Sequence, residues 1–163
     1  MNIPFYFIRR WYLRNVMKIK IGKDTYIGMG CYIVGTFIEI GDNTVINRGT
    51  YLDGRVPLKI GNNVSISNYC YIQTNSHDPQ SPDFKGIWEP VIIGNNVWVG
   101  AKAIILTGVT LEDGCVVGAG AVVTKNIPAY TIAVGCPAKV IKKRNPKLTY
   151  KIKFFPIFDS DIQ

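Results

Sequence analysis

The sequence predicts an all-β protein built as a parallel β-helix, and two features of one stretch carry this prediction. In residues 91–127 an aliphatic side chain returns at every sixth position, at Ile93, Val99, Ile105, Leu111, Val117 and Val123. A small or medium-sized residue follows each of them four positions later, at Val97, Ala103, Val109, Cys115, Ala121 and Ile127. A period of six is neither that of an α-helix nor that of an alternating strand. Such a fixed short period indicates a solenoid.

The spacing within each repeat explains why the chain should fold into triangular coils. The fourth residue of one hexad and the first of the next are two positions apart, so in an extended chain both side chains point to the same side. The residues between such pairs are mostly Gly, Asn, Asp, Lys and Thr, which suit corners. Three hexads then make one coil of about eighteen residues with an apolar interior.

The same frame continues upstream and joins most of the chain into one β-helix domain, residues 21–127. The predicted inward positions of three earlier coils are Ile21, Ile27 and Ile33, then Ile40, Ile46 and Leu52, then Ile60, Ile66 and Ile72. The frame slips where the first and second of these coils close. Between Ile72 and Ile93 it is interrupted by an excursion that leaves the helix near His77 and returns near Pro90, so residues 78–90 are predicted to form a protruding loop.

The segment before the repeats, residues 1–20, mixes aromatic and aliphatic residues with five basic ones: Arg9, Arg10, Arg14, Lys18 and Lys20. The charges interrupt any run long enough to span a bilayer, and no export signal follows. We expect a helix or loop that caps the open end of the prism, because solenoids need caps. The alternative is a basic, aromatic surface that rests on anionic lipid at the inner face of the membrane. Both agree with a cytoplasmic protein.

Residues 128–163 are expected to form a turn and a tail outside the repeats. Basic residues cluster there at Lys139, Lys142, Lys143 and Arg144, and the chain has a net charge of +8. This charge favours an anionic partner. Phosphate groups on a small molecule fit better than nucleic acid, because the sequence contains no recognised nucleic-acid-binding module.

The four cysteines indicate a reducing compartment rather than disulfides. Cys31, Cys70 and Cys115 occupy inward positions of the repeat and are expected in the core. Cys136 lies outside the frame and has no assignment. With a single histidine and no ligand spacing typical of a metal site, no bound metal is expected.

The run IGNNVWVGAKAIILTGVTLEDGCVVGAGAVVTKNIP, followed by AVGCPAKVIKKR, resembles the hexapeptide-repeat acyltransferases. The likeness is greatest to the galactoside and maltose acetyltransferases and the exopolysaccharide O-acetyltransferases, and it covers residues 21–144. It implies a left-handed β-helix, a homotrimer, and transfer of an acetyl group from acetyl-CoA to a sugar hydroxyl. The left hand comes from this resemblance alone, since the general rule favours right-handed crossovers.

The resemblance places the family's catalytic histidine at the junction of helix and loop, where this chain has His77. Free imidazole titrates at about pH 6.5, which suits a general base for a hydroxyl that attacks a thioester. Asn75, Asp78 or a backbone carbonyl could orient the ring, and the first two are also candidate substrate contacts. Direct transfer is expected rather than an acyl-enzyme, because the cysteines in the frame point inward and no nucleophile elbow is present.

For the acceptor, Asn47 in VINRGTYLD matches the family's acceptor-binding asparagine. Tyr51, Asp53 and Arg55 are weaker candidates for sugar contacts. Asn47 and His77 should lie on different faces of one subunit. They are expected to meet across the groove between subunits of a trimer.

For the coenzyme, Trp98 matches the family's aromatic position. The matching pantetheine-binding strand and corner residues are Gly100, Ala101, Ala119, Thr124 and Lys125. Lys125, Lys142 and Arg144 are expected to meet the CoA phosphates. Two departures from the family pattern are visible: Cys136 stands where asparagine is usual, and Thr107 where proline is frequent.

Three functions remain open at this point. The first is an O-acetyltransferase that modifies a sugar or lipid-linked sugar in cell-surface polysaccharide biosynthesis. The second is an N-acetyltransferase for an amino sugar, or a transferase with a different small acceptor. The third is a β-helix scaffold without catalysis. A γ-type carbonic anhydrase is excluded because the chain has one histidine.

Overall fold

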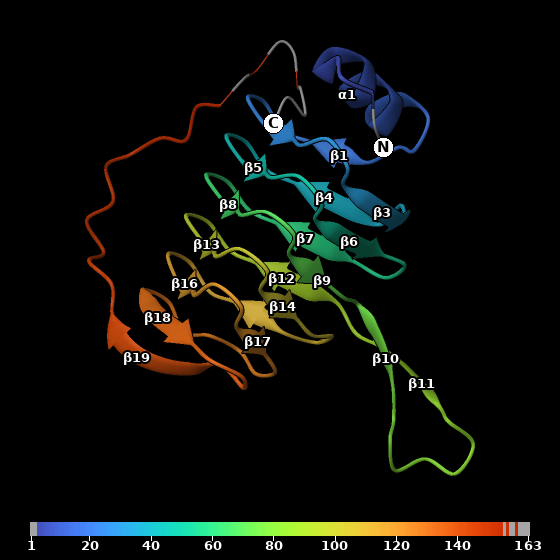
Figure 1. The fold of residues 1–163 in the computed structure, drawn as a ribbon, viewed down its shortest axis with the longest axis vertical. Helices are drawn as coiled ribbons and strands as arrows, with labels where there is room; N and C mark the ends of the chain where they lie inside the picture. Colours follow the sequence, from blue (N-terminus) through green and yellow to red (C-terminus); the bar gives the residue numbers. More distant parts are fainter. Residues whose placement is uncertain (1–2, 155, 157–158, 160–163) are drawn as a thin grey trace.

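The computed structural model describes residues 3–154, 156 and 159. Its body is a triangular prism of stacked parallel strands, with a helix over one end and a hairpin that projects from its side (Figure 1). The first face holds β1 (Lys20–Ile21), β4 (Ile38–Ile40), β7 (Leu58–Ile60), β12 (Val91–Ile93) and β15 (Thr110–Leu111). The second holds β2 (Tyr26–Ile27), β5 (Val45–Ile46), β8 (Ser65–Ile66), β13 (Trp98–Val99), β16 (Val116–Val117), β18 (Thr131–Val134) and β19 (Lys139–Lys143). The third holds β3 (Tyr32–Gly35), β6 (Tyr51–Gly54), β9 (Tyr71–Ile72), β14 (Ile104–Ile105) and β17 (Val122–Val123).

The hexad frame predicts the core correctly. The aliphatic positions and the small positions four residues later are buried in one continuous cluster along the prism axis. Ile33, in the first coil, is only half-buried and packs against that cluster. The two slips of the frame fall between β3 and β4 and between β6 and β7, where the chain passes from the third face to the first face of the next coil.

Within the described residues the strands complete five coils and begin a sixth. Ile127 pairs with Leu111, and β18 then pairs with β16 in parallel before β19 returns antiparallel to it. The repeat architecture therefore continues past Pro128, where the sequence pattern fades.

The predicted excursion is an antiparallel hairpin of β10 (Asn75–His77) and β11 (Gly86–Trp88). It begins at Asn75, three residues earlier than the predicted loop, because the strand extends through His77, which pairs with Gly86.

Helix α1 (Tyr6–Asn15) lies over the first coil, as expected for a cap (Figure 1). It buries Tyr6, Arg9 and Leu13, and Leu13 joins the core. The helix ends at Asn15, so Arg10 and Arg14 lie on it and Lys18 does not. None of the described helices is long and apolar enough to cross a membrane.

The C-terminal tail runs back along the second face, from the last coil to the first. Arg144 donates to the carbonyls of Asn96 and Gly114, and Asn63 bonds the backbone of Tyr150 and of Ile152. At the far end, the Asp159 carboxylate accepts hydrogen bonds from Arg9, from Tyr26 and from the Met29 N–H. The tail therefore ties the two ends of the described chain together, which the sequence did not predict.

Candidate active site

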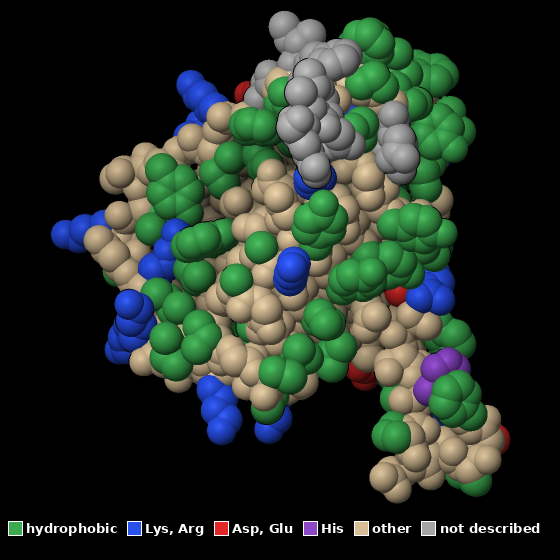
Figure 2. All heavy atoms as spheres, in the orientation of Figure 1, with side chains coloured by type: hydrophobic (Ala, Val, Ile, Leu, Met, Phe, Trp, Pro, Cys, Tyr) green, Lys and Arg blue, Asp and Glu red, His purple; other side chains and the backbone are tan. Residues whose placement is uncertain are grey.

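The hairpin presents the imidazole of His77 to solvent (Figure 2). The ring stacks on Phe84, with 3.8 Å between ring centroids and 14° between planes. Its Nδ1 lies 2.8 Å from the carbonyl oxygen of Phe84. A carbonyl only accepts, so in the neutral ring Nδ1 carries the hydrogen and Nε2 keeps its lone pair. Of the three orienting groups considered, the backbone carbonyl makes the contact.

Asp78 and Asn75 have other partners. Asp78 accepts from the backbone N–H of Gln80, 2.9 Å away, and so shapes the turn of the hairpin. Asn75 accepts a hydrogen bond from the guanidinium of Arg55. Neither side chain orients the ring, and their contact with a substrate stays a prediction.

Asp53 is fully buried and forms a two-bond pair with Arg55. Arg55 donates from Nε to Oδ1 at 2.9 Å and from its terminal nitrogen to Oδ2 at 2.8 Å. The Thr74 N–H also donates to this carboxylate, at 3.3 Å. Burial raises the pKa of the Asp53 carboxyl, but the hydrogen bonds from Arg55 and Thr74 outweigh it and the pKa falls below its usual value. This network ties the second coil to the start of the hairpin.

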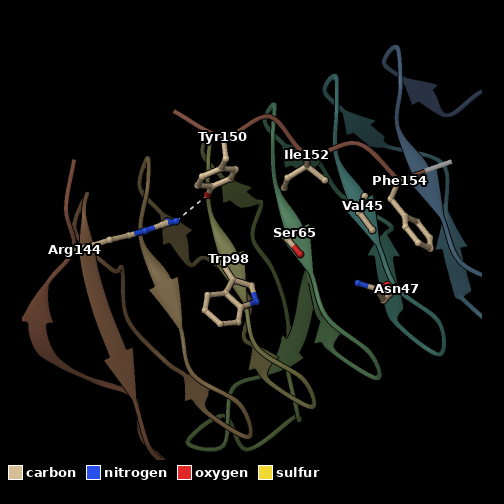
Figure 3. A pocket seen from close by; sticks show the side chains of 8 residues that line it. All are labelled: Val45, Asn47, Ser65, Trp98, Arg144, Tyr150, Ile152 and Phe154. Carbon is tan, nitrogen blue, oxygen red and sulfur yellow. Dashed lines mark hydrogen bonds between the residues drawn. The ribbon is translucent and has the colours of Figure 1, made fainter. Parts of the chain in front are cut away.

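A groove of about 500 Å³ lies on the second face, between the coils and the tail (Figure 3). The coils contribute Val45, Asn47, Ser65 and Trp98, and the region after β18 contributes Arg144, Tyr150, Ile152 and Phe154. The structure therefore brings together the predicted acceptor residue Asn47 and the predicted coenzyme residue Trp98.

The side chains that line the groove differ in how far hydrogen bonds within the protein already engage them. Asn47 donates to the Ile66 carbonyl of the next coil at 2.9 Å, and Trp98 is half-exposed with its Nε1 3.3 Å from the Ser67 hydroxyl. Arg144 donates to two carbonyls and to the Tyr150 hydroxyl at 2.8 Å, so its guanidinium is already engaged.

The other predicted coenzyme residues fall on two corners of the prism. Gly100, Ala101 and Ala119 lie at the corner between the second and third faces, where the backbone N–H of Gly100 donates to Val117 in the next coil. Close stacking explains Gly100, because an added Cβ would lie 2.5 Å from the Ala119 nitrogen. Thr124 and Lys125 are exposed at the corner between the third and first faces.

Lys142 is exposed on β19, opposite Ile132. It shares the second face with Trp98, but not the corner of Lys125. One chain therefore does not bring all these residues together, and it separates His77 from the groove residues as well.

Sequence reasoning missed the tail wall of this groove. Tyr150, Ile152 and Phe154 alternate in the sequence, and this period of two was a usable signal for an extended segment with one apolar side. Nothing in that pattern indicated the face on which the segment would pack.

The cysteine thiols in the core are unsuited to carry an acyl group. Burial raises the pKa of Cys31 and of Cys70 to about 11, and that of Cys115 to about 12. A thiol must lose its proton to act as a nucleophile. Among the described residues, no three His, Cys, Asp or Glu side chains gather as a metal site would need.

Comparison with known proteins agrees with this architecture. A family model described as the hexapeptide repeat of succinyl-transferase matches residues 18–53 and 90–125. Galactoside O-acetyltransferase of Escherichia coli is 33% identical over 144 residues, which cover 85% of this chain and 70% of that protein. An Escherichia coli protein provisionally named as a colanic acid biosynthesis acetyltransferase is 33% identical over 138 residues, or 83% and 76% of the two chains. The chain spans from 46% to 76% of the lengths of its curated relatives.

Solved structures share the fold. A maltose O-acetyltransferase from Clostridium difficile superposes with a TM-score of 0.79 at 34% identity, over 86% of this chain and 76% of that one. A hexapeptide-repeat acetyltransferase from Vibrio cholerae, solved with acetyl-CoA, gives 0.78 at 29% identity, over 85% and 77%.

These findings confirm two expectations at the level of the family: an acetyltransferase, and acetyl-CoA as its co-substrate. They also confirm the predicted fold class, a left-handed parallel β-helix. The chain is a member of the hexapeptide-repeat acetyltransferases.

Proposed function

We propose that the protein transfers an acetyl group from acetyl-CoA to a sugar hydroxyl, with His77 as the general base. The observation that supports this most directly is the hydrogen bond between Nδ1 of His77 and the Phe84 carbonyl. It leaves Nε2 unprotonated on an exposed hairpin, as a base for an incoming hydroxyl must be. The relatives' names add the acceptor class, since galactoside and maltose enzymes are among them.

The reaction then proceeds in one transfer. Nε2 of His77 takes the proton of the hydroxyl while its oxygen attacks the thioester carbonyl. The carbon–sulfur bond breaks, and the protonated imidazole returns the proton to the departing CoA thiolate. The high pKa of each buried thiol supports this direct route over an acyl-cysteine.

Asn47 is proposed to bind the acceptor, with Asn75 and Asp78 beside the base. Trp98, Gly100, Ala101 and Ala119 would receive the pantetheine arm, whose amides can bond backbone groups along the stacked coils. Thr124, Lys125 and Lys142 would hold its phosphate end, and the ammonium groups supply charge for it.

A homotrimer would complete the site. Asn47 and Trp98 line a groove on the second face, whereas His77 projects from the hairpin that follows the third. In a symmetric ring, the hairpin of one copy can reach the groove of the next. The split of the coenzyme residues over two corners is explained in the same way.

The proposed setting is the cytoplasm, where acetyl-CoA is made, in the biosynthesis of a cell-surface polysaccharide. The provisional names of the Escherichia coli relatives, in lipopolysaccharide and colanic acid biosynthesis, favour this setting.

The test is to incubate wild type and His77→Ala with acetyl-CoA and a panel of sugars and amino sugars, following CoA thiol release and product NMR. We expect O-acetylated sugar from the wild type, and a rate lower by about two to four orders of magnitude in the variant. Acetyl transfer only to amines would indicate the N-acetyltransferase, and no transfer would indicate the scaffold. Equal rates of the two proteins would rule out His77 as the base.

A further inference from the structure

Helix α1 also carries large apolar residues on the side that faces away from the prism. Phe7 is 65% exposed, Trp11 60% and Val16, just after the helix, 53%. We call this surface the outer aromatic face; its residues are Phe5, Phe7, Ile8, Trp11, Tyr12 and Val16. In Figure 2 it contributes to the hydrophobic side chains that cover the end of the molecule where α1 lies.

Capping the β-helix does not require this surface. The inward side of α1 already covers the first coil with Tyr6, Arg9 and Leu13. That side even holds a charge, since Arg9 is 1% exposed and pairs with Asp159 at 3.0 Å. A surface helix normally turns its apolar side to the core and its charges to water. On α1 the buried side holds Arg9 beside Tyr6 and Leu13, and aromatic residues are exposed on the other side. A large exposed apolar patch marks an interaction site.

The surroundings of the outer aromatic face are positively charged. Residues 1–23 contain six Lys and Arg and no Asp or Glu. Arg14 and Lys18 are exposed, while Lys20 is engaged with Glu39 at 2.6 Å. An aromatic centre with a basic rim is the composition of helices that lie flat in the interface of an anionic bilayer. Tyr and Trp rings settle at headgroup level, and Arg and Lys reach the phosphates.

Charge also argues against a second copy of this chain as the occupant. If the outer aromatic faces of two copies met, the exposed Arg14 and Lys18 of one copy would lie against those of the other, so charge disfavours this face-to-face contact.

We propose that the outer aromatic face docks the protein on an anionic lipid surface. The position of the groove agrees with docking at this end of the prism. Its tail wall reaches the first coil, where Phe154 packs on Tyr26 with 5.0 Å between ring centroids. If the proposed function holds, a lipid-linked sugar could enter from that end. Docking itself does not depend on catalysis.

The experiment is sedimentation of the full chain with phosphatidylcholine vesicles, with or without phosphatidylglycerol, at low and high salt. We expect binding to the anionic vesicles only, weakened by salt. Phe7→Ser with Trp11→Ser should reduce the partition coefficient about a hundredfold or more, since burial of each aromatic ring contributes about tenfold or more. Arg14→Gln with Lys18→Gln should reduce it about 30-fold, since each basic residue contributes about fivefold.

Matched controls separate this docking from general effects of charge and hydrophobicity. Ile141→Ser removes a side chain that is 58% exposed on β19, at the other end of the prism. Lys102→Gln with Lys147→Gln removes the same charge from exposed sites elsewhere. Both control proteins should bind as the wild type does.

Three results would overturn the proposal: equal binding to both kinds of vesicle, no binding to either, or unchanged binding of the two α1 variants. Loss of self-association in Phe7→Ser with Trp11→Ser, seen by light scattering, would assign the face to a second copy instead. Acetylation of a sugar without a lipid should be unaffected by this variant, so failure of docking and failure of the proposed function can be told apart.

Discussion

The pair of Arg9 and Asp159 provides a sharp test of how the chain ends are held. Asp159→Asn keeps the size of the side chain and removes its charge. It leaves Arg9, which is 1% exposed, without a counter-charge, and weakens the bonds from the Tyr26 hydroxyl and from the Met29 N–H at 2.8 Å. Removing one partner of a buried pair costs about 3–5 kcal/mol. Because Asp159 itself is 12% exposed, we expect the lower limit, about 3 kcal/mol.

Hydrogen exchange is the appropriate assay, because α1 can open while the β-helix stays folded. About 3 kcal/mol corresponds to about a hundredfold loss of protection for α1 amides. Amides of β8 and β13 in the middle of the prism should not change. As a matched control, Glu39→Gln breaks an exposed pair with Lys20 and should cost less than about 1 kcal/mol. Protection of α1 within threefold of the wild type in Asp159→Asn would refute the reasoning.

Three further predictions concern the Asp159 carboxylate, the pair of Arg55 with Asp53, and the core. Burial raises the pKa of the Asp159 carboxyl, but the bonds from Tyr26 and its other partners lower the pKa overall. The carboxylate therefore stabilises the fold fully above the unfolded pKa of about 3.9, and this stabilisation is lost as pH falls through the lower folded value. After correction for intrinsic rates, exchange of α1 amides should be constant from pH 7 to 5 and rise in stronger acid in the wild type, but not in Asp159→Asn. Arg55→Lys cannot keep two bonds to the Asp53 carboxylate and also reach Asn75, at the start of the hairpin that carries His77. The base is then positioned less precisely, so kcat should fall about tenfold while KM for acetyl-CoA stays the same. An unchanged kcat would contradict this. Leu52→Ala, at a fully buried position, should lower the free energy of unfolding by about 2–5 kcal/mol in urea titrations, and a loss below 1 kcal/mol would be inconsistent with the packed core.

The sequence was sufficient for the β-helix because each coil repeats one local rule. An aliphatic residue at Ile66 and a small one at Cys70 define a buried corner without reference to distant contacts. The same rule located the hairpin, since an excursion shows as a break in the frame. It did not locate the sixth turn, because the frame slips there: Ile127 follows Val123 by four residues instead of six and pairs with Leu111, and Ala133 then pairs with Val117.

The residues of the candidate site could be predicted from the sequence, but the groups that their side chains contact within the protein could not. His77 stood out by its place in the frame, yet the carbonyl that orients it belongs to Phe84, across the hairpin. Asp53 was predicted to contact a sugar, and the structure shows why sequence could not settle this: its carboxylate is fully buried against Arg55 and Thr74. Such pairing depends on how successive coils stack.

The tail was the largest omission. Its contacts join Asp159 to Arg9, residues 150 positions apart. No local periodicity encodes a contact of that range, and the basic residues before the tail indicated an anionic partner rather than packing on the prism. Only the packing on the second face shows that the tail forms a wall of the groove.

The most direct test of the central claim, an active site shared between copies, is mixing of two inactive proteins. Asn47→Ala keeps the His77 hairpin, and His77→Ala keeps the groove. After unfolding and refolding together in equal amounts, about one quarter of all sites should hold both intact residues, because each mixed trimer contains one such site in three. We expect acetyl transfer to recover to about that fraction of the wild-type rate, whereas each variant refolded alone stays inactive. No recovery in trimers shown by mass spectrometry to be mixed, or full activity in a wild-type monomer, would contradict the account.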